Sequence, residues 1–204
     1  MSDTRASDFA VGDLHAGTVA LSTAAFQEQL QGQRIVGLLG ADFIASGALE
    51  VNFEKHAVTM YASVPPDLAA RGWSVLPLRL DYNVPLIKAQ FSGKDGNFIA
   101  DLGADFSTLY PHYFSQFQIK IPWGEPDRES MVTIGGKPFG VKHFTMNRMI
   151  LGDLIFGNVQ VVVPSESYAQ EVDYDGLIGR DTLSSFNLIF DYKNRQLWFK
   201  QINP

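Results

Sequence analysis

The sequence predicts an all-β protein, and three observations support this. Its 204 residues include 15 Phe and 7 Tyr, and together with many Val, Ile and Thr this composition favours strands. Short runs in which apolar and polar residues alternate are separated by turns that contain glycine. The third observation is that this strand-like pattern repeats. Residues 11–21 and 37–61 each have a counterpart later in the chain with the same alternation of apolar residues. A hydrophobic content of 46% is ample for a core.

Two pairs of segments make up the repeat. Residues 11–21 (VGDLHAGTVAL) align with residues 151–161 (LGDLIFGNVQV) at an offset of 140. Residues 37–61 align with residues 176–200 at an offset of 139, so a gap of one residue reconciles the two blocks. Matched glycines, aspartates and apolar alternation across about 50 positions make chance a poor explanation.

The first predicted elements belong to the earlier copy of the repeat. Residues 41–47 (ADFIASG) predict a short helix with Asp42 as its N-cap. Residues 48–61 alternate as a β-hairpin does. Residues 62–76 predict a connection, because Pro-Pro and Gly interrupt regular structure there.

The central elements are strands. Residues 84–91 (VPLIKAQF) and 97–102 (NFIADL) predict a hairpin that the segment SGKDG connects. The segment STLYPHYF that follows predicts the end of a strand and a turn at Pro111.

The last elements repeat the pattern of the first. Residues 130–144 predict two strands around a tip that contains Gly135 and Gly136, a candidate mobile hairpin. Residues 149–164 predict two further short strands. Residues 180–186 (RDTLSSF) predict a short helix opened by Asp181 as N-cap, followed by a terminal hairpin that turns at Lys-Asn.

Charge and composition exclude several classes of function. A net charge of −6 without a Lys/Arg-rich run disfavours a nucleic-acid partner. No apolar run approaches the roughly 20 residues that span a bilayer. The absence of cysteine excludes disulfides and thiolate sites. The first ten residues lack the features of a signal peptide, so localisation stays open between export, if a signal lies upstream, and the cytoplasm.

Other polar residues carry weaker signals. The four histidines show no metal-ligand spacing, and nothing nominates a base that would activate Ser107 or Thr108 as a nucleophile. The segment GGKPFG lacks the spacing and context of a phosphate-binding loop. Asp13 and Asp153 are expected in turns.

The segment FIADLGADFSTLY at 98–110 poses the main question, because Asp101 is either a catalytic carboxylate at a strand end or a turn residue. The similar segment GLLGADF at 37–43 aligns with GLIGRDT and not with the Asp101 loop, so Asp42 is a false match. The counterpart of Asp101 in the first unit would lie upstream of Met1. We therefore expect that unit to begin halfway through.

The order of these motifs resembles the aspartic peptidases of retropepsin and pepsin type. DLGADFSTLY is similar to their active-site loop, GLIGRDTL to the motif that buttresses it, and the Gly-Gly hairpin to their flap. The resemblance implies an aspartic-protease-like closed β-barrel unit at 77–204 and, at 1–61, the C-terminal half of another such unit. Residues 62–76 would connect the two.

The resemblance also implies roles for individual residues. Asp101 would be a catalytic carboxylate of an aspartic endopeptidase, sharing one proton with a second aspartate so that the pair activates water. The other implied residues are substrate contacts at Gly103, Ala104, Asp105, Gly135 and Gly136, with structural support from Leu102, Gly179, Arg180 and Asp181. No metal or organic cofactor is implied.

One paired interaction follows from the same resemblance. Arg180 and Asp105 match positions that pair in retropepsin-like proteins, so we expect an ion pair that ties the active-site loop to the helix. The first unit has Ala41 at the place of Arg180 and would lack this brace.

Two departures from the family pattern leave alternatives open. Leu102 stands where the family has Thr or Ser, whose hydroxyl hydrogen-bonds across the two-fold axis. The chain also supplies one Asp-x-Gly loop, whereas a dyad needs two. The second comes from another protease lobe or from a homodimer mate, or no dyad exists. The alternative function is a catalytically degenerate module of the same fold that binds a peptide or protein without cutting it.

Overall fold

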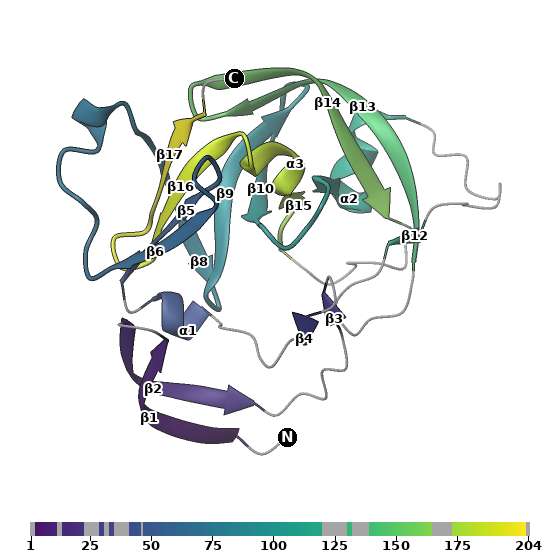
Figure 1. The fold of residues 1–204 in the computed structure, drawn as a ribbon. Coiled ribbons are helices and arrows are strands. Elements are labelled where there is room, and N and C mark those ends of the chain that lie inside the picture. The colour runs from purple at the N-terminus through teal and green to yellow at the C-terminus, as the bar shows by residue number, and fades with distance from the viewer. Residues whose placement is uncertain are drawn as a thin grey trace.

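Strands dominate the computed structural model, which describes residues 3–11, 14–22, 29–30, 33–34, 41–45, 47–119, 130–131, 139–164 and 173–202. The prediction of an all-β fold is confirmed, since the helical elements are single turns (Figure 1). In the first part of the chain the elements are β1 (Asp3–Val11), β2 (Leu14–Ser22), β3 (Gln29–Leu30), β4 (Gln33–Arg34), α1 (Ala41–Ile44), β5 (Ala48–Asn52), β6 (Ala57–Tyr61) and η1 (Ala69–Arg71).

The second part of the chain contains a closed barrel and three strands of a second sheet. Its elements are β7 (Ser74–Pro77), β8 (Arg79–Asp81), β9 (Val84–Phe91), β10 (Lys94–Ala100), β11 (Thr108–Leu109), α2 (Pro111–Phe114), η2 (Ser115–Phe117), β12 (Ser130–Met131), β13 (Phe139–Leu151), β14 (Leu154–Pro164), β15 (Gly176–Ile178), α3 (Arg180–Leu183), β16 (Phe186–Asp191) and β17 (Gln196–Gln201). Neighbouring strands run β13-β14-β11-β15-β10-β9, and β9 pairs with β13 again through Met149 and Phe91. The ring therefore closes, as the resemblance implied.

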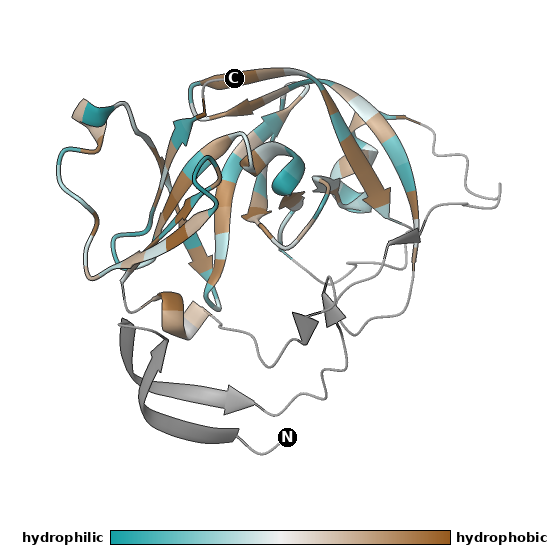
Figure 2. Cartoon of the chain, in the orientation of Figure 1, coloured by the Kyte–Doolittle hydropathy of each residue, from teal (hydrophilic) through white to brown (hydrophobic). Residues whose placement is uncertain are grey.

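A second sheet contains strands from both parts of the chain. Its order is β6-β5-β16-β17-β7, so the hairpin at 48–61 lies against the terminal hairpin. One face contributes Leu188, Leu197 and Phe199 to the main core, and the residues between β6 and β7 cover part of the other face with Leu68 and Trp73. Figure 2 shows the apolar stretches of these strands alternating with polar ones, as half-buried strands require.

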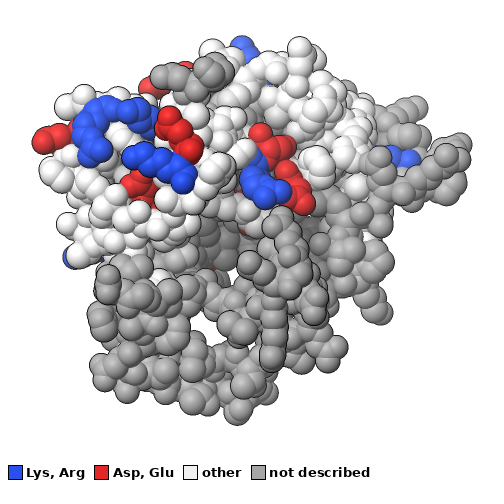
Figure 3. Space-filling view, viewed as in Figure 1, with Lys and Arg blue, Asp and Glu red and all other residues white. Residues whose placement is uncertain are grey.

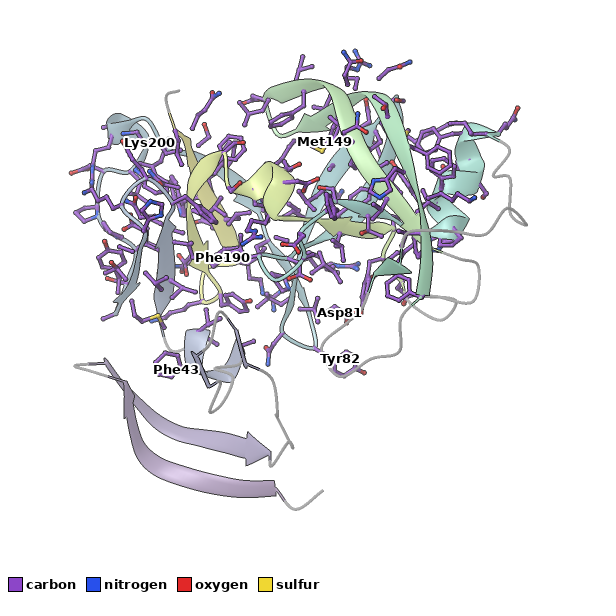
Figure 4. The ribbon with its side chains drawn as sticks, turned by 45° about the vertical axis from the view of Figure 1, so that its right-hand side comes forward. Phe43, Asp81, Tyr82, Met149, Phe190 and Lys200 are labelled. Atoms are coloured by element: carbon purple, nitrogen blue, oxygen red, sulfur yellow. The ribbon has the colours of Figure 1, made fainter. Side chains whose placement is uncertain are left out.

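Large apolar side chains fill the space between the two sheets. Met149 and Phe190 point into this interior from opposite sheets, whereas Lys200 lies on the outer side (Figure 4). The rings of Phe91, Phe98 and Tyr113 pack edge to face, with 5.2 Å between the centroids of Phe98 and Tyr113. Such pairs stabilise a core beyond their buried area.

Local boundaries differ from the sequence predictions at several places, among them β13, which joins two strands that were expected to be separate. The β9–β10 turn is confined to Ser92 and Gly93, both with positive φ, so β10 starts at Lys94 and ends at Ala100. Pro111 opens helix α2, because its fixed φ suits a first helical turn. The helix expected at 180–186 ends at Leu183, since Phe186 already pairs in β16.

The unfolding free energy is expected to fall at alkaline pH because of Tyr113. Its fully buried hydroxyl donates to the Lys94 carbonyl, and burial raises the pKa of Tyr113 to about 12, against about 10 in an unfolded chain. The folded state thus favours the neutral phenol, so its contribution to stability is complete below pH 10 and is lost as the pH rises to 12. Urea unfolding should show the unfolding free energy falling over this range. Tyr113→Phe should flatten the fall, whereas Tyr82→Phe at an exposed position should not.

Candidate functional site

Asp101 opens a loop that arches over the end of β15. The loop leaves β10, which runs parallel to β15 with Ala100 opposite Ile178. It returns in β11, which lies on the other side of β15 with Thr108 opposite Leu177. The Asp101 amide donates to the Ile178 carbonyl at 3.0 Å, so the first residue of the loop is tied to the strand that it crosses.

The Asp101 carboxylate is oriented by its own loop. Its Oδ1 accepts a hydrogen bond from the Gly103 amide at 2.8 Å, and the residue is only partly buried. A Cβ at position 103 would lie 3.2 Å from the same oxygen, which makes glycine the favourable residue. Within the described part of the chain, Asp101 makes no hydrogen bond to a second carboxylate. The geometry therefore presents one fixed acidic group.

Helix α3 holds the far side of the loop through backbone bonds. The Arg180 amide donates to the Ala104 carbonyl at 2.8 Å, and the Asp181 amide donates to the Asp105 carbonyl at 3.2 Å. Gly179 is required for this approach, since a Cβ there would lie 2.6 Å from the Phe106 carbonyl carbon. The support that the resemblance implied for Gly179 thus consists of close backbone packing.

Asp181 has a different structural role from the predicted one. The N-cap of α3 is Gly179, so the prediction of Asp181 as N-cap is wrong. The Asp181 carboxylate accepts hydrogen bonds from the amide of Ser107 at 3.0 Å and from its hydroxyl at 2.8 Å. Ser107 is fully buried and also accepts from the Gly179 amide at 3.1 Å. Asp42, likewise expected as an N-cap, lies within the single turn of α1.

The predicted ion pair between Arg180 and Asp105 is present. The Arg180 guanidinium lies 2.5 Å from the Asp105 carboxylate, and both side chains are exposed, at 57% and 65%. Figure 3 shows charges of both signs gathered at the position of α3. The pair borders a shallow pocket of about 500 Å³ lined by Phe53, Asp105, Phe106, Arg180, Asp181 and Ser184. Phe53, from the turn between β5 and β6, brings the first part of the chain to this surface.

Leu102 anchors the loop by apolar contact. Its partly buried side chain packs against the main core, so this position supports the loop without the hydroxyl that the family pattern has. The remaining candidate residues, Gly135 and Gly136, lie outside the described residues. The hairpin expected to carry them begins where β12 pairs with β13, Met131 opposite Phe139.

Sequence reasoning missed the buried serine. Ser107 was considered only as a nucleophile, whereas it joins the loop to both Gly179 and Asp181. Its position directly before the β-prone Thr108 was the one local signal that it returns into the sheet. Nowhere in the described ranges do three His, Asp or Glu side chains gather closely enough to hold a metal ion. No helix there is long and apolar enough to cross a membrane.

Comparison with known proteins gives one family. Residues 87–182 match the family model described as aspartyl protease. Among solved structures, a retropepsin-like aspartic protease from Rickettsia conorii is similar, with 19% identity and a TM-score of 0.49 over 63% of this chain and 89% of that one. The sequence matches none of the curated proteins with which it was compared.

Proposed function

We propose that this chain acts as an aspartic endopeptidase with Asp101 as one of its two catalytic carboxylates, since residues 87–182 match the aspartyl protease family model. The observation that carries the proposal is the Asp101 loop itself. Its carboxylate is partly exposed and held by the Gly103 amide, on a loop that β15 and α3 fix at both ends. A catalytic group needs this combination of access and fixed orientation.

The proposed reaction uses a pair of carboxylates. Two such groups at short range share one proton, because a second negative charge beside the first is unfavourable. The ionised member takes a proton from water, while the protonated member polarises the carbonyl of the scissile peptide. The pair titrates as a unit. Asp101 supplies one of these groups.

The loop also limits how a peptide substrate can be contacted. The carbonyls of Ala104 and Asp105 already accept hydrogen bonds from α3. We therefore place substrate contacts at the exposed Gly103 and at the amides of Ala104 and Asp105. Gly135 and Gly136 would close over the peptide from the flap and exclude water.

A second candidate function is peptide binding without hydrolysis. Leu102 favours it, because a core-packed leucine cannot make the hydrogen bond across a two-fold axis that stiffens paired loops. The two candidates differ in whether the Asp101 carboxylate has chemistry to perform.

Replacing Asp101 by asparagine separates these candidates. The amide cannot accept the proton from water, so we expect peptide hydrolysis to fall by about a thousandfold or more. Cleavage of a peptide mixture by the unaltered chain and by the variant would be followed by mass spectrometry. The thermal midpoint should hardly change, since an amide oxygen can still accept from Gly103.

Asp153→Asn is the matched control, because Asp153 lies exposed in the β13–β14 turn. Unchanged hydrolysis in Asp101→Asn would refute the role of Asp101. Peptide binding by both proteins without cleavage by either would favour the binding module.

A further inference from the structure

The outer face of the second sheet carries a row of polar residues. Asn187 of β16 pairs with Lys200 of β17. On the other side of β16, Ile189 pairs with Glu50 of β5, and the same register places Asn52 opposite Asn187. Side chains at paired positions lie on the same face of a sheet. The side chains of Asn52, Asn187 and Lys200 therefore lie next to one another on three neighbouring strands, on the face directed away from the main core.

Two further segments turn this row into a pocket. Arg71 at the end of η1 and the nearby Trp73 line it, as do Glu54 and Lys55 from the β5–β6 turn. This outer pocket has a volume of about 280 Å³, close to the lower end of small-ligand sites at about 300 Å³. It shares no lining residue with the pocket beside helix α3. Figure 3 shows charged side chains of both signs gathered between η1 and the β5–β6 hairpin.

Two polar side chains in the wall of the outer pocket are buried without good hydrogen bonds. Asn187 is 6% exposed, and its carboxamide contacts only the amide and the carboxylate of Glu54, each at 3.4 Å, which is long for a hydrogen bond. Trp73 is 9% exposed, and its indole N–H has no acceptor among the described residues, whereas the indole of Trp198 donates to Gln196. Buried donors normally have a partner, so both groups point to a ligand that carries acceptors.

The charges around the outer pocket favour an anion. The Glu50 carboxylate accepts a hydrogen bond from the Tyr61 hydroxyl at 2.6 Å, so a neutral group already satisfies part of it. Three cations line the pocket against two carboxylates, and within the part of the chain that the structure describes these cations make no ion pair: Lys55, Arg71 and Lys200. In a chain with a net charge of −6, such a group produces a local positive potential that attracts anions.

We propose that the outer pocket binds a small oxyanion, a ligand with a phosphate or carboxylate group. Arg71 supplies a planar pair of donors that matches two oxygens of either group, and the ammonium groups of Lys55 and Lys200 add charge. The carboxamide of Asn187 and the indole N–H of Trp73 are the neutral donors that the ligand would satisfy. The site is separate from the Asp101 loop and does not depend on peptide hydrolysis.

A titration followed by NMR tests the proposal. Inorganic phosphate and succinate are added separately to the ¹⁵N-labelled chain at constant ionic strength, with Trp73→Phe to assign the indole signal. We expect a saturable shift of the Trp73 indole resonance. The Trp198 indole is an internal control and should shift far less, because its N–H already donates to Gln196. Saturation by phosphate alone, by succinate alone or by both supports the site and identifies which group it accepts.

Charge-removing variants show whether the pocket itself holds the anion. Arg71→Gln and Lys200→Gln should each raise the dissociation constant by about tenfold or more, since each removes a charge-assisted hydrogen bond. Both side chains are exposed, so the thermal midpoint should hardly change. Lys193→Gln is the matched control, because Lys193 is exposed in the β16–β17 turn outside the pocket.

Two results would overturn the proposal. One is a Trp73 resonance that does not shift to saturation with either anion. The other is equal weakening by Lys193→Gln and Arg71→Gln, because this would mean that the anion responds to the overall charge of the protein and not to this pocket.

Discussion

Gly176→Ala is expected to destabilise the protein by about 4 kcal/mol or more, the largest effect of any single methyl group added to the described barrel strands. Gly176 has a φ of +152°, a conformation that residues with a side chain rarely adopt. A Cβ there would lie 2.0 Å from the Thr108 carbonyl oxygen. Because Thr108 and Gly176 lie in paired strands at the centre of the barrel, neither backbone can move without breaking the sheet.

Gly157→Ala is the matched control, since Gly157 is also a strand glycine but has open space around its Cα. Urea unfolding of both variants at neutral pH would measure the difference. A loss below about 1 kcal/mol for Gly176→Ala would show that the β15 backbone at Gly176 does not pack against the Thr108 carbonyl of β11.

Elements whose signal is local were predictable from the sequence. The alternation in 84–91 gave β9 with its stated bounds, and the Gly-Asp turn before Leu154 produced the β13–β14 hairpin. The β9–β10 connection was placed too long, because its tight turn depends on positive φ at Ser92 as well as Gly93. Sequence patterns indicate that glycine tolerates such a conformation, but they do not reveal that serine adopts it.

The site was predicted in part, and through resemblance more than through pattern. Asp101 at a strand end and the Arg180–Asp105 pair both followed from motif order. The contact between Asp181 and Ser107, separated by 74 residues, depends on β15 passing between β10 and β11. An aspartate near the start of a short helix is locally indistinguishable from an N-cap, so Asp181 was misassigned.

Asp181→Ala is expected to reduce the unfolding free energy by about 2–4 kcal/mol. The substitution removes the acceptor of both the amide and the hydroxyl of Ser107, which has no exposed surface. Buried donors without a partner cost about 1–3 kcal/mol each. The loop that begins at Asp101 would lose its attachment near its end, so hydrolysis should fall as well.

Asp105→Ala is the matched comparison, because it removes the other carboxylate between loop and helix. Its ion pair with Arg180 is exposed on both sides, and such pairs contribute about 0–1 kcal/mol because solvent screens them. Urea unfolding should therefore rank Asp181→Ala well above Asp105→Ala. Asp181→Asn should lie between them, since its Oδ1 can still accept both Ser107 bonds but without the negative charge that strengthens them. The reverse ranking would mean that the surface ion pair, and not the buried serine, holds the Asp101 loop against α3.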